Sequence, residues 1–162
     1  MAEQNTPAPE QNGETEQATG PQFAIEKLYV KDLSLEVPNA PQIFLDRDAP
    51  QIAIELQTNV NSLGENMYDV ALKVTVTARA GDKTVFLVEV VQAGVFGVTG
   101  VPDEQLQPIL MIACPNILFP YARETISTTV TRAGFLPVLL NPVNFEALYA
   151  QQQAARQQQQ VQ

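Results

Sequence analysis

The regular alternation of apolar and polar residues is the clearest pattern in the first hundred residues of the chain. Between Gln51 and Asn61 every second side chain is predominantly apolar, and the same period of two continues from Tyr68 to Ala80. A period of two places successive side chains on opposite faces of an extended chain. Both segments are therefore predicted to be strands, each with one apolar face.

Two further strands are expected on either side of this pair. The alternation over residues 23–35 predicts a first strand with apolar side chains on both of its sides. The residues from Thr84 to Phe96 predict a fourth strand, and Gly81-Asp82 between two alternating segments is typical of a tight hairpin. Residues 61–66 are expected to form a turn.

The loop after the first strand carries an apolar cluster of its own. Residues 38–41, with a proline at each end, are expected to end that strand and to open the loop. Ile43-Phe44-Leu45 follows directly. Three large apolar side chains in a loop indicate that it either folds onto the sheet or contacts a partner.

Helical patterns replace the alternation in the second half of the chain. Glycines at positions 94, 97 and 100 are expected to loosen the chain, and Pro102 can then open a short helix that Pro108 interrupts. A long helix is expected to begin at Cys114, with Pro115 in its first turn and Asn116 as a local cap.

The ends of the last helices are also marked in the sequence. Gly134 is expected to end the long helix, because glycine suits the left-handed conformation that follows many helices. Residues 135–140 form an apolar connector, and Asn141 is expected to cap a final helix. Residues 151–162 are rich in glutamine and are expected to extend this helix before fraying.

Four antiparallel strands followed by helices predict an α+β domain with both helices packed on one face of the sheet. The expected organisation is an acidic, disordered tail over residues 1–20, one domain over residues 21–150 and a glutamine-rich tail over residues 151–162. The first segment has several glutamates, no basic residue and little apolar surface to offset the entropy of ordering.

Composition narrows the classes of partner. The 162 residues carry a formal net charge of -9, which disfavours nucleic acid and anionic membrane surfaces and suits a basic partner. A single cysteine excludes an intrachain disulfide and fits a reducing compartment. With no apolar segment long enough to span a bilayer and no signal-peptide pattern, we expect a cytoplasmic protein without direct membrane insertion.

The residues for common enzyme chemistry are missing. The chain has no histidine, and its single cysteine cannot form a thiolate metal site. The glycines between positions 94 and 100 lack the spacing of a phosphate loop. Asp46 and Asp48 are better explained by a solvated turn than by a calcium loop, which needs more oxygen ligands. We therefore expect a binding protein without cofactor, metal or catalytic residues.

Several segments together resemble the SecB family of bacterial protein-export chaperones. The most specific of them runs from Cys114 to Glu124, where Cys-Pro-Asn-Ile-Leu-Phe-Pro-Tyr-Ala-Arg-Glu opens the expected long helix. The others are residues 29–36 with 38–41, residues 74–78, residues 86–90 and residues 142–145. The glutamine-rich end departs from the family, whose tail is acidic.

The resemblance implies a fold, an assembly and a function. Members of this family form homotetramers, arranged as dimers of dimers, of subunits with a four-stranded antiparallel sheet, a long helix and a second helix. They hold preproteins unfolded in the cytosol without ATP and pass them to SecA, the translocation ATPase. We therefore expect unfolded preproteins and SecA as partners of this chain.

The resemblance also assigns residues to the two kinds of protein contact on neighbouring strands. The SecA-contact positions of the family fall on Asp32, Glu36, Leu87 and Glu89. A period of two places Asp32 and Glu36 on one side of the first strand, and Leu87 and Glu89 on one side of the fourth. The subunit-pairing positions fall on Val88, Val90 and Gln92, on the opposite side of the fourth strand.

Client binding in the family uses a long apolar groove between the sheet, the connector and the helices. The residues expected to line it here are Phe23, Ile25, Phe44, Ile52, Ile54, Leu56, Cys114, Phe119, Tyr121 and Phe135, each of which would equally fit a role in the core. Two other functions stay open. The chain could be a general or toxin–antitoxin-associated SecB-like chaperone that is not dedicated to export, or an α+β domain that binds a small molecule.

Overall fold

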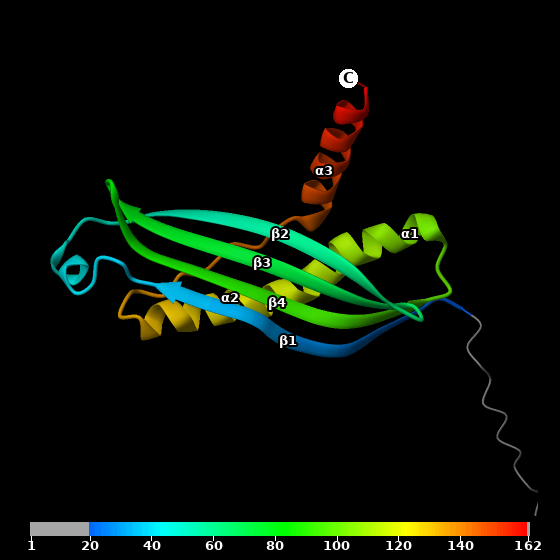
Figure 1. Ribbon diagram of the computed structural model, residues 1–162, viewed down its shortest axis with the longest axis horizontal. Coiled ribbons are helices and arrows are strands. Elements are labelled where there is room, and N and C mark those ends of the chain that lie inside the picture. Colours follow the sequence, from blue (N-terminus) through cyan, green and yellow to red (C-terminus); the bar gives the residue numbers. More distant parts are fainter. Residues whose placement is uncertain (1–19, 162) are drawn as a thin grey trace, which may run out of the picture.

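The structure, a computed structural model, describes residues 20–161 and contains one antiparallel sheet with helices after it (Figure 1). The sheet has four strands in the spatial order β1-β4-β3-β2. The strands are β1 (Gln22–Glu36), β2 (Gln51–Gly64), β3 (Met67–Ala80) and β4 (Lys83–Thr99). The prediction of an α+β fold with this sheet is confirmed, whereas the acidic tail expected over residues 1–20 lies, except for Gly20, outside the described residues.

The strands at the two hairpins are longer than the sequence pattern suggests. The turn between β3 and β4 is tight, with Ala80 opposite Lys83 and a positive φ of 62° at Gly81, as the Gly81-Asp82 pair predicts. The turn between β2 and β3 is confined to a few residues, because Gly64, Glu65 and Asn66 all have positive φ values that reverse the chain abruptly.

The glycines expected to loosen the chain instead lie inside β4, except for Gly100 just beyond it. At Gly94 an added Cβ would lie 2.7 Å from the ring of Phe96 and 3.0 Å from the side chain of Leu28. The glycine therefore leaves room for an aromatic ring that folds back over its own strand, which is a packing role in a regular strand.

A continuous helix of 30 residues follows the sheet, where the sequence pattern predicts two helices. It consists of α1 (Asp103–Pro108), the π-helical segment η2 (Ile109–Ala113) and α2 (Cys114–Arg132). The expected interruption at Pro108 and the expected cap at Asn116 are both wrong. In the π segment the amide of Cys114 donates to the carbonyl of Ile109, so the ladder of hydrogen bonds widens beside the prolines instead of ending.

The predicted end of this helix is confirmed. Gly134 has a φ of 95°, and the amide of Phe135 donates to the carbonyl of Val130 at 3.2 Å. A left-handed glycine with such a bond satisfies carbonyls that the last helical turn would leave without a donor. The chain then returns along the sheet as the connector of residues 133–144.

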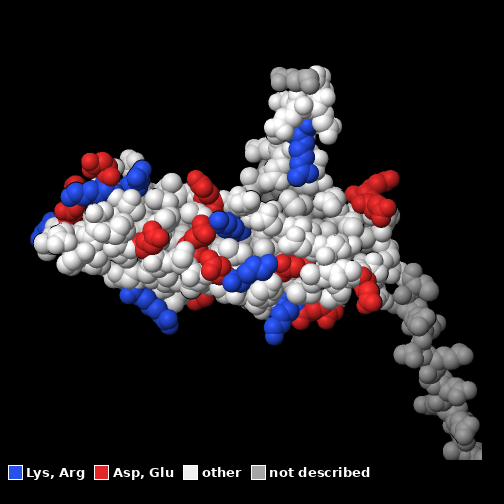
Figure 2. All heavy atoms as spheres, viewed as in Figure 1, with Lys and Arg blue, Asp and Glu red and all other residues white. Residues whose placement is uncertain are grey.

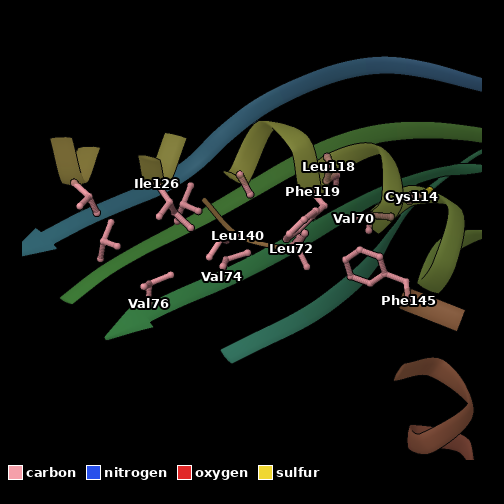
Figure 3. Packing of buried hydrophobic residues seen from close by; sticks show 14 of the residues in the cluster. Val70, Leu72, Val74, Val76, Cys114, Leu118, Phe119, Ile126, Leu140 and Phe145 are labelled. Carbon is pink, nitrogen blue, oxygen red and sulfur yellow. The ribbon is translucent and has the colours of Figure 1, made fainter. Parts of the chain in front are cut away.

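The hydrophobic core lies between α2 and the two central strands β3 and β4. Figure 3 shows side chains of β3, among them Leu72 and Val74, meeting Leu118, Phe119 and Ile126 of α2. Leu72, Val74, Leu118 and Ile126 are fully buried. Since each such side chain contributes about 1.5–3 kcal/mol on burial, this layer contributes strongly to the stability of the domain.

Helix α2 does not cover the edge strands β1 and β2. The exposed large apolar side chains of the two strands are Phe23, Ile25, Val30, Leu33, Leu35, Ile52, Ile54 and Leu63. All but Leu63 pair with positions whose side chains face the core, so the helix side of the sheet carries an apolar strip along each edge.

The loop between β1 and β2 contains the short 3-10 helix η1 (Gln42–Leu45). Ile43 is buried, whereas Phe44 is 49 % exposed and Leu45 is largely exposed. The apolar cluster of this loop therefore folds onto the sheet only in part.

The last helix, α3 (Phe145–Gln160), extends away from the sheet (Figure 1). Its cap is Asn144, whose Oδ1 accepts the amide of Ala147 at 3.0 Å, and not Asn141 as predicted. Phe145 is its one fully covered side chain, with its ring edge-on to Phe119. The expected packing of α3 on the sheet face is wrong, because the remainder of the helix is mainly glutamine and alanine.

Candidate functional site

The face of the sheet that points away from α2, here called the open face, brings the four expected SecA-contact residues together. The pairing of the strands places Asp32 opposite Val91, and Val91 opposite Lys73. The next row across the sheet is Ser34, Glu89 and Thr75, and the one after it is Glu36, Leu87 and Thr77. Asp32, Glu36, Leu87 and Glu89 thus occupy consecutive rows of the adjacent strands β1 and β4.

The carboxylate of Glu89 is already engaged by neighbours on β3. Its Oε1 lies 3.3 Å from Nζ of Lys73, and its Oε2 accepts the hydroxyl of Thr75 at 3.0 Å. Figure 2 shows acidic and basic side chains next to one another over the middle of the sheet in this view. The open face therefore carries partly neutralised charges around apolar residues such as Leu87 and Val91, and it is not a continuous acidic patch.

A second group of charges on the open face was not predicted from the sequence. Asp69 of β3 is only 6 % exposed; its Oδ1 accepts the Tyr29 hydroxyl at 2.7 Å and its Oδ2 the Lys31 ammonium at 2.5 Å. Burial raises the pKa of Asp69, but the hydrogen bonds from Lys31 and Tyr29 outweigh it and leave the pKa below its ordinary value.

An irregularity in β1 brings the adjacent residues Lys31 and Asp32 to the same face of the sheet. The register of β1 against β4 shifts between Val30 and Asp32, so Lys31 is an extra residue in its strand. Because of this bulge, Asp32 pairs with Val91 on the open face, the same face on which Lys31 reaches Asp69. The sequence signal was the adjacent pair Lys31-Asp32, which breaks the alternation of the first strand.

The structure places Val88, Val90 and Gln92 on the side of β4 that faces the core. Val88 and Val90 are completely covered within a single chain, and Gln92 is 4 % exposed. The Nε2 of Gln92 donates to the carbonyl of Tyr29 at 3.1 Å. Direct contact of these side chains with another subunit, as expected from the resemblance, does not fit their burial.

Three of the expected client residues line one hollow of about 420 Å³. Phe44 comes from η1, Ile52 from β2 and Phe135 from the connector, and all three border the same space. The rings of Phe44 and Phe135 stack with centroids 5.1 Å apart, and Phe135 also lies against Phe86 of the core. The hollow therefore has an apolar wall and opens between the sheet and the connector.

The remaining expected client residues divide into accessible and buried ones. Ile54 and Leu56 continue the apolar strip of β2 beyond this hollow, whereas Phe23 and Ile25 lie on β1 at the opposite edge of the sheet. Tyr121 is exposed on α2. These residues do not form a single groove within one chain.

The expectation that Cys114 and Phe119 line the client groove is wrong, because both belong to the core. Cys114 is fully covered and Phe119 is 5 % exposed. Burial raises the pKa of the Cys114 thiol to about 12. Apolar type and helical spacing are shared by core and groove residues, so the sequence could not separate them.

Two structural findings bear on other functions. No helix within residues 20–161 is long and apolar enough to cross a membrane. In the same part of the chain, no group of three or more His, Cys, Asp or Glu side chains could hold a metal ion.

Comparison with known proteins agrees with the geometry. The family described as "Preprotein translocase subunit SecB" matches residues 16–156. The protein-export protein SecB of Azoarcus sp. (strain BH72) is 63% identical over 138 residues, which are 85% of this chain and 91% of that protein. The protein of the same name from Methylobacillus flagellatus is 61% identical over 152 residues, or 94% and 92% of the two chains.

A solved structure also matches the fold. The SecB-like chaperone of Mycobacterium tuberculosis, determined in complex with a peptide from an antitoxin, superposes with a TM-score of 0.63. The match covers 75% of this chain and 90% of that one at 16% identity, so it supports the fold alone. With a family match over most of its length and relatives near 60% identity, the chain belongs to the SecB family of non-enzymatic protein-export chaperones.

Proposed function

We propose that this protein is an ATP-independent cytosolic holdase that keeps preproteins unfolded and delivers them to SecA, working as a homotetramer arranged as a dimer of dimers. The observation that carries the proposal is the difference between the two faces of the sheet. The open face carries the charged side chains and ion pairs, while the helix side carries uncovered apolar strips and a hollow at the β2 edge. One subunit can therefore bind an apolar client and a basic partner on separate surfaces.

The apolar side suits extended, unfolded chain. Phe44, Ile52 and Phe135 share a hollow, and Ile54 and Leu56 continue from it along β2. Each apolar client side chain buried there contributes about 1.5–3 kcal/mol. Several weak contacts along one long client add up without requiring a particular sequence.

The open face suits SecA through Asp32, Glu36, Leu87 and Glu89. Carboxylates around one leucine combine steering of a basic surface with a small apolar anchor. Glu89→Lys is expected to weaken SecA binding, measured by calorimetry, and to leave client binding unchanged. Glu65→Lys, with the same change of charge in the turn between β2 and β3, is the control. Equal SecA affinity of Glu89→Lys and wild type would contradict the assignment.

Client capture is tested with one slow-folding preprotein in its unfolded and folded states. Only the unfolded state should bind, without nucleotide and with a large negative change in heat capacity, the mark of apolar burial. Leu56→Asp should weaken capture while circular dichroism shows an intact fold. Equal binding of both states, or capture that requires nucleotide, would exclude a holdase.

The assembly and the alternative functions are tested on the same sample. Light scattering of the purified protein should give the mass of a tetramer, with and without client. Client capture in the absence of measurable SecA binding would support a general chaperone instead. A small molecule that stays bound through purification at one per chain would support a ligand-binding domain.

A further inference from the structure

Lys73 forms an ion pair with Glu89, the carboxylate that a basic partner would need. Its Nζ lies 3.3 Å from Oε1 of Glu89, and the Thr75 hydroxyl donates to Oε2 of the same carboxylate. A lysine or arginine of a partner that approaches Glu89 therefore meets a carboxylate whose two oxygens are both engaged. The partner has to share these oxygens or displace the ammonium of Lys73.

The surroundings allow Lys73 to leave. The side chains of Lys73 and Glu89 are 39% and 28% exposed, so the pair is held in a wet environment where ion pairs are weak. Lys73 and Glu89 line one shallow hollow of about 360 Å³ on the open face, together with Glu55 of β2. A displaced ammonium thus stays in water beside a second carboxylate and is not left buried and unpaired.

We propose that Lys73 is an internal competitor for Glu89 that lowers the affinity of the open face for its basic partner. This inference rests on the proposed function of that face. Before docking, the Lys73 ammonium partly satisfies Glu89. During docking, a basic group of the partner replaces it, and after release the intramolecular pair forms again. The pair weakens the complex, which favours dissociation once a client has been delivered.

The position of Lys73 in the sheet supports this role. Lys73 pairs with Val91, which in turn pairs with Asp32, so it lies in the same row as one expected contact residue and diagonal to another. It belongs to β3, whereas the four expected contact residues come from β1 and β4. Lys73 can therefore change its orientation without moving the strands that carry those residues.

Replacement of Lys73 by methionine tests the proposal, because methionine keeps much of the aliphatic length and removes the ammonium. Calorimetry with purified SecA should give a dissociation constant about twofold to fivefold lower than that of wild type, the effect of freeing one exposed ion pair. Lys27→Met is the matched control. Lys27 lies on the open face opposite Val95, and the structure gives it no ion pair among residues 20–161.

The double variant Lys73→Met/Glu89→Gln separates local competition from net charge. If Lys73 acts through Glu89, Lys73→Met should no longer tighten binding once Glu89 is neutral. If the double variant binds SecA more tightly than Glu89→Gln alone, the proposal is overturned. So does a Lys73→Met affinity that is weaker than wild type or no better than that of Lys27→Met.

The same titrations with an oligoarginine peptide in place of SecA distinguish a failure of the proposed delivery to SecA from a failure of the proposed competition by Lys73. Failure of wild type to bind SecA would refute the proposed delivery function. Tighter oligoarginine binding by Lys73→Met, lost in the double variant, would still support the competitor. No gain with either probe would overturn it.

Discussion

Replacing Asp69 by asparagine is expected to lower the free energy of unfolding by about 1–3 kcal/mol at pH 7. The Asp69 carboxylate is buried and accepts hydrogen bonds from Tyr29 at 2.7 Å and from Lys31 at 2.5 Å. Asparagine keeps an oxygen for the tyrosine, but its amide group then faces the ammonium of Lys31, donor against donor. The expected cost stays below that of a fully buried pair because Lys31 is partly exposed and can turn to water.

The pH dependence follows from the direction of the pKa shift. The pKa of Asp69 in the folded protein lies below its ordinary value of 3.8, since the hydrogen bonds from Lys31 and Tyr29 outweigh the opposing effect of burial. The carboxylate therefore contributes its full stability above that value and loses it as the pH falls through the folded-state pKa. The difference between wild type and Asp69→Asn should be constant from pH 7 to about pH 5 and should narrow toward pH 3.

Urea unfolding followed by circular dichroism measures both quantities. All variants need the same protein concentration, because association of subunits makes apparent stability depend on concentration. Asp32→Asn is the control, since Asp32 is an exposed carboxylate in another row of the same face and has no ion pair among residues 20–161, so its change should stay within about 0.5 kcal/mol. Equal stability of Asp69→Asn and wild type at pH 7, or a gap that does not narrow in acid, would refute this account.

Three further outcomes are expected. Val90→Asp should destabilise the fold by at least about 2 kcal/mol, because it buries an unpaired polar group under α2; urea unfolding unchanged from wild type, with dimers in place of tetramers, would contradict this. Leu118→Ala should lower the free energy of unfolding by about 2–5 kcal/mol, and a much smaller loss by urea unfolding would mean that α2 packs loosely there. Cys114 should react very slowly with a maleimide at pH 8 and rapidly in denaturing urea, because burial covers its thiol and raises its pKa to about 12; fast labelling of the native protein would show that the core opens.

The strands could be predicted from the sequence because apolar and polar residues alternate along them, most regularly in β2 and β3. The helix could not be predicted as one unit, because prolines at positions 108 and 115 argue for a break on local grounds. Between these prolines the helix continues as a π segment with wider hydrogen bonds, and such a segment has no reliable signature in a single sequence. The same limit applies to Asn141 and Asn144, since both asparagines can cap a helix and the packing of Phe145 selects between them.

At the candidate site, the alternation of residues predicts which side chains share a face, but not which face is buried. Alternation separates Leu87 and Glu89 from Val88 and Val90, and the structure confirms two different faces. It does not reveal which of these faces the chain covers with its own helix, so Val88 and Val90 were expected at a subunit contact and are found in the core. Asp69 was missed because its partners Tyr29 and Lys31 lie 40 and 38 residues away in the sequence, on a strand that β4 separates from β3.

The position of β4 in the sheet has a consequence for insertions and deletions. One strand supplies Leu87 and Glu89 to the outer surface and Val88 and Val90 to the interior, and it is paired on both edges. Adding or removing a single residue in its middle would exchange the two sets, exposing valines and forcing a carboxylate under the helix. Length changes in this family should therefore be absent from the middle of this strand and concentrate in connections such as residues 46–50, where no pairing has to be kept.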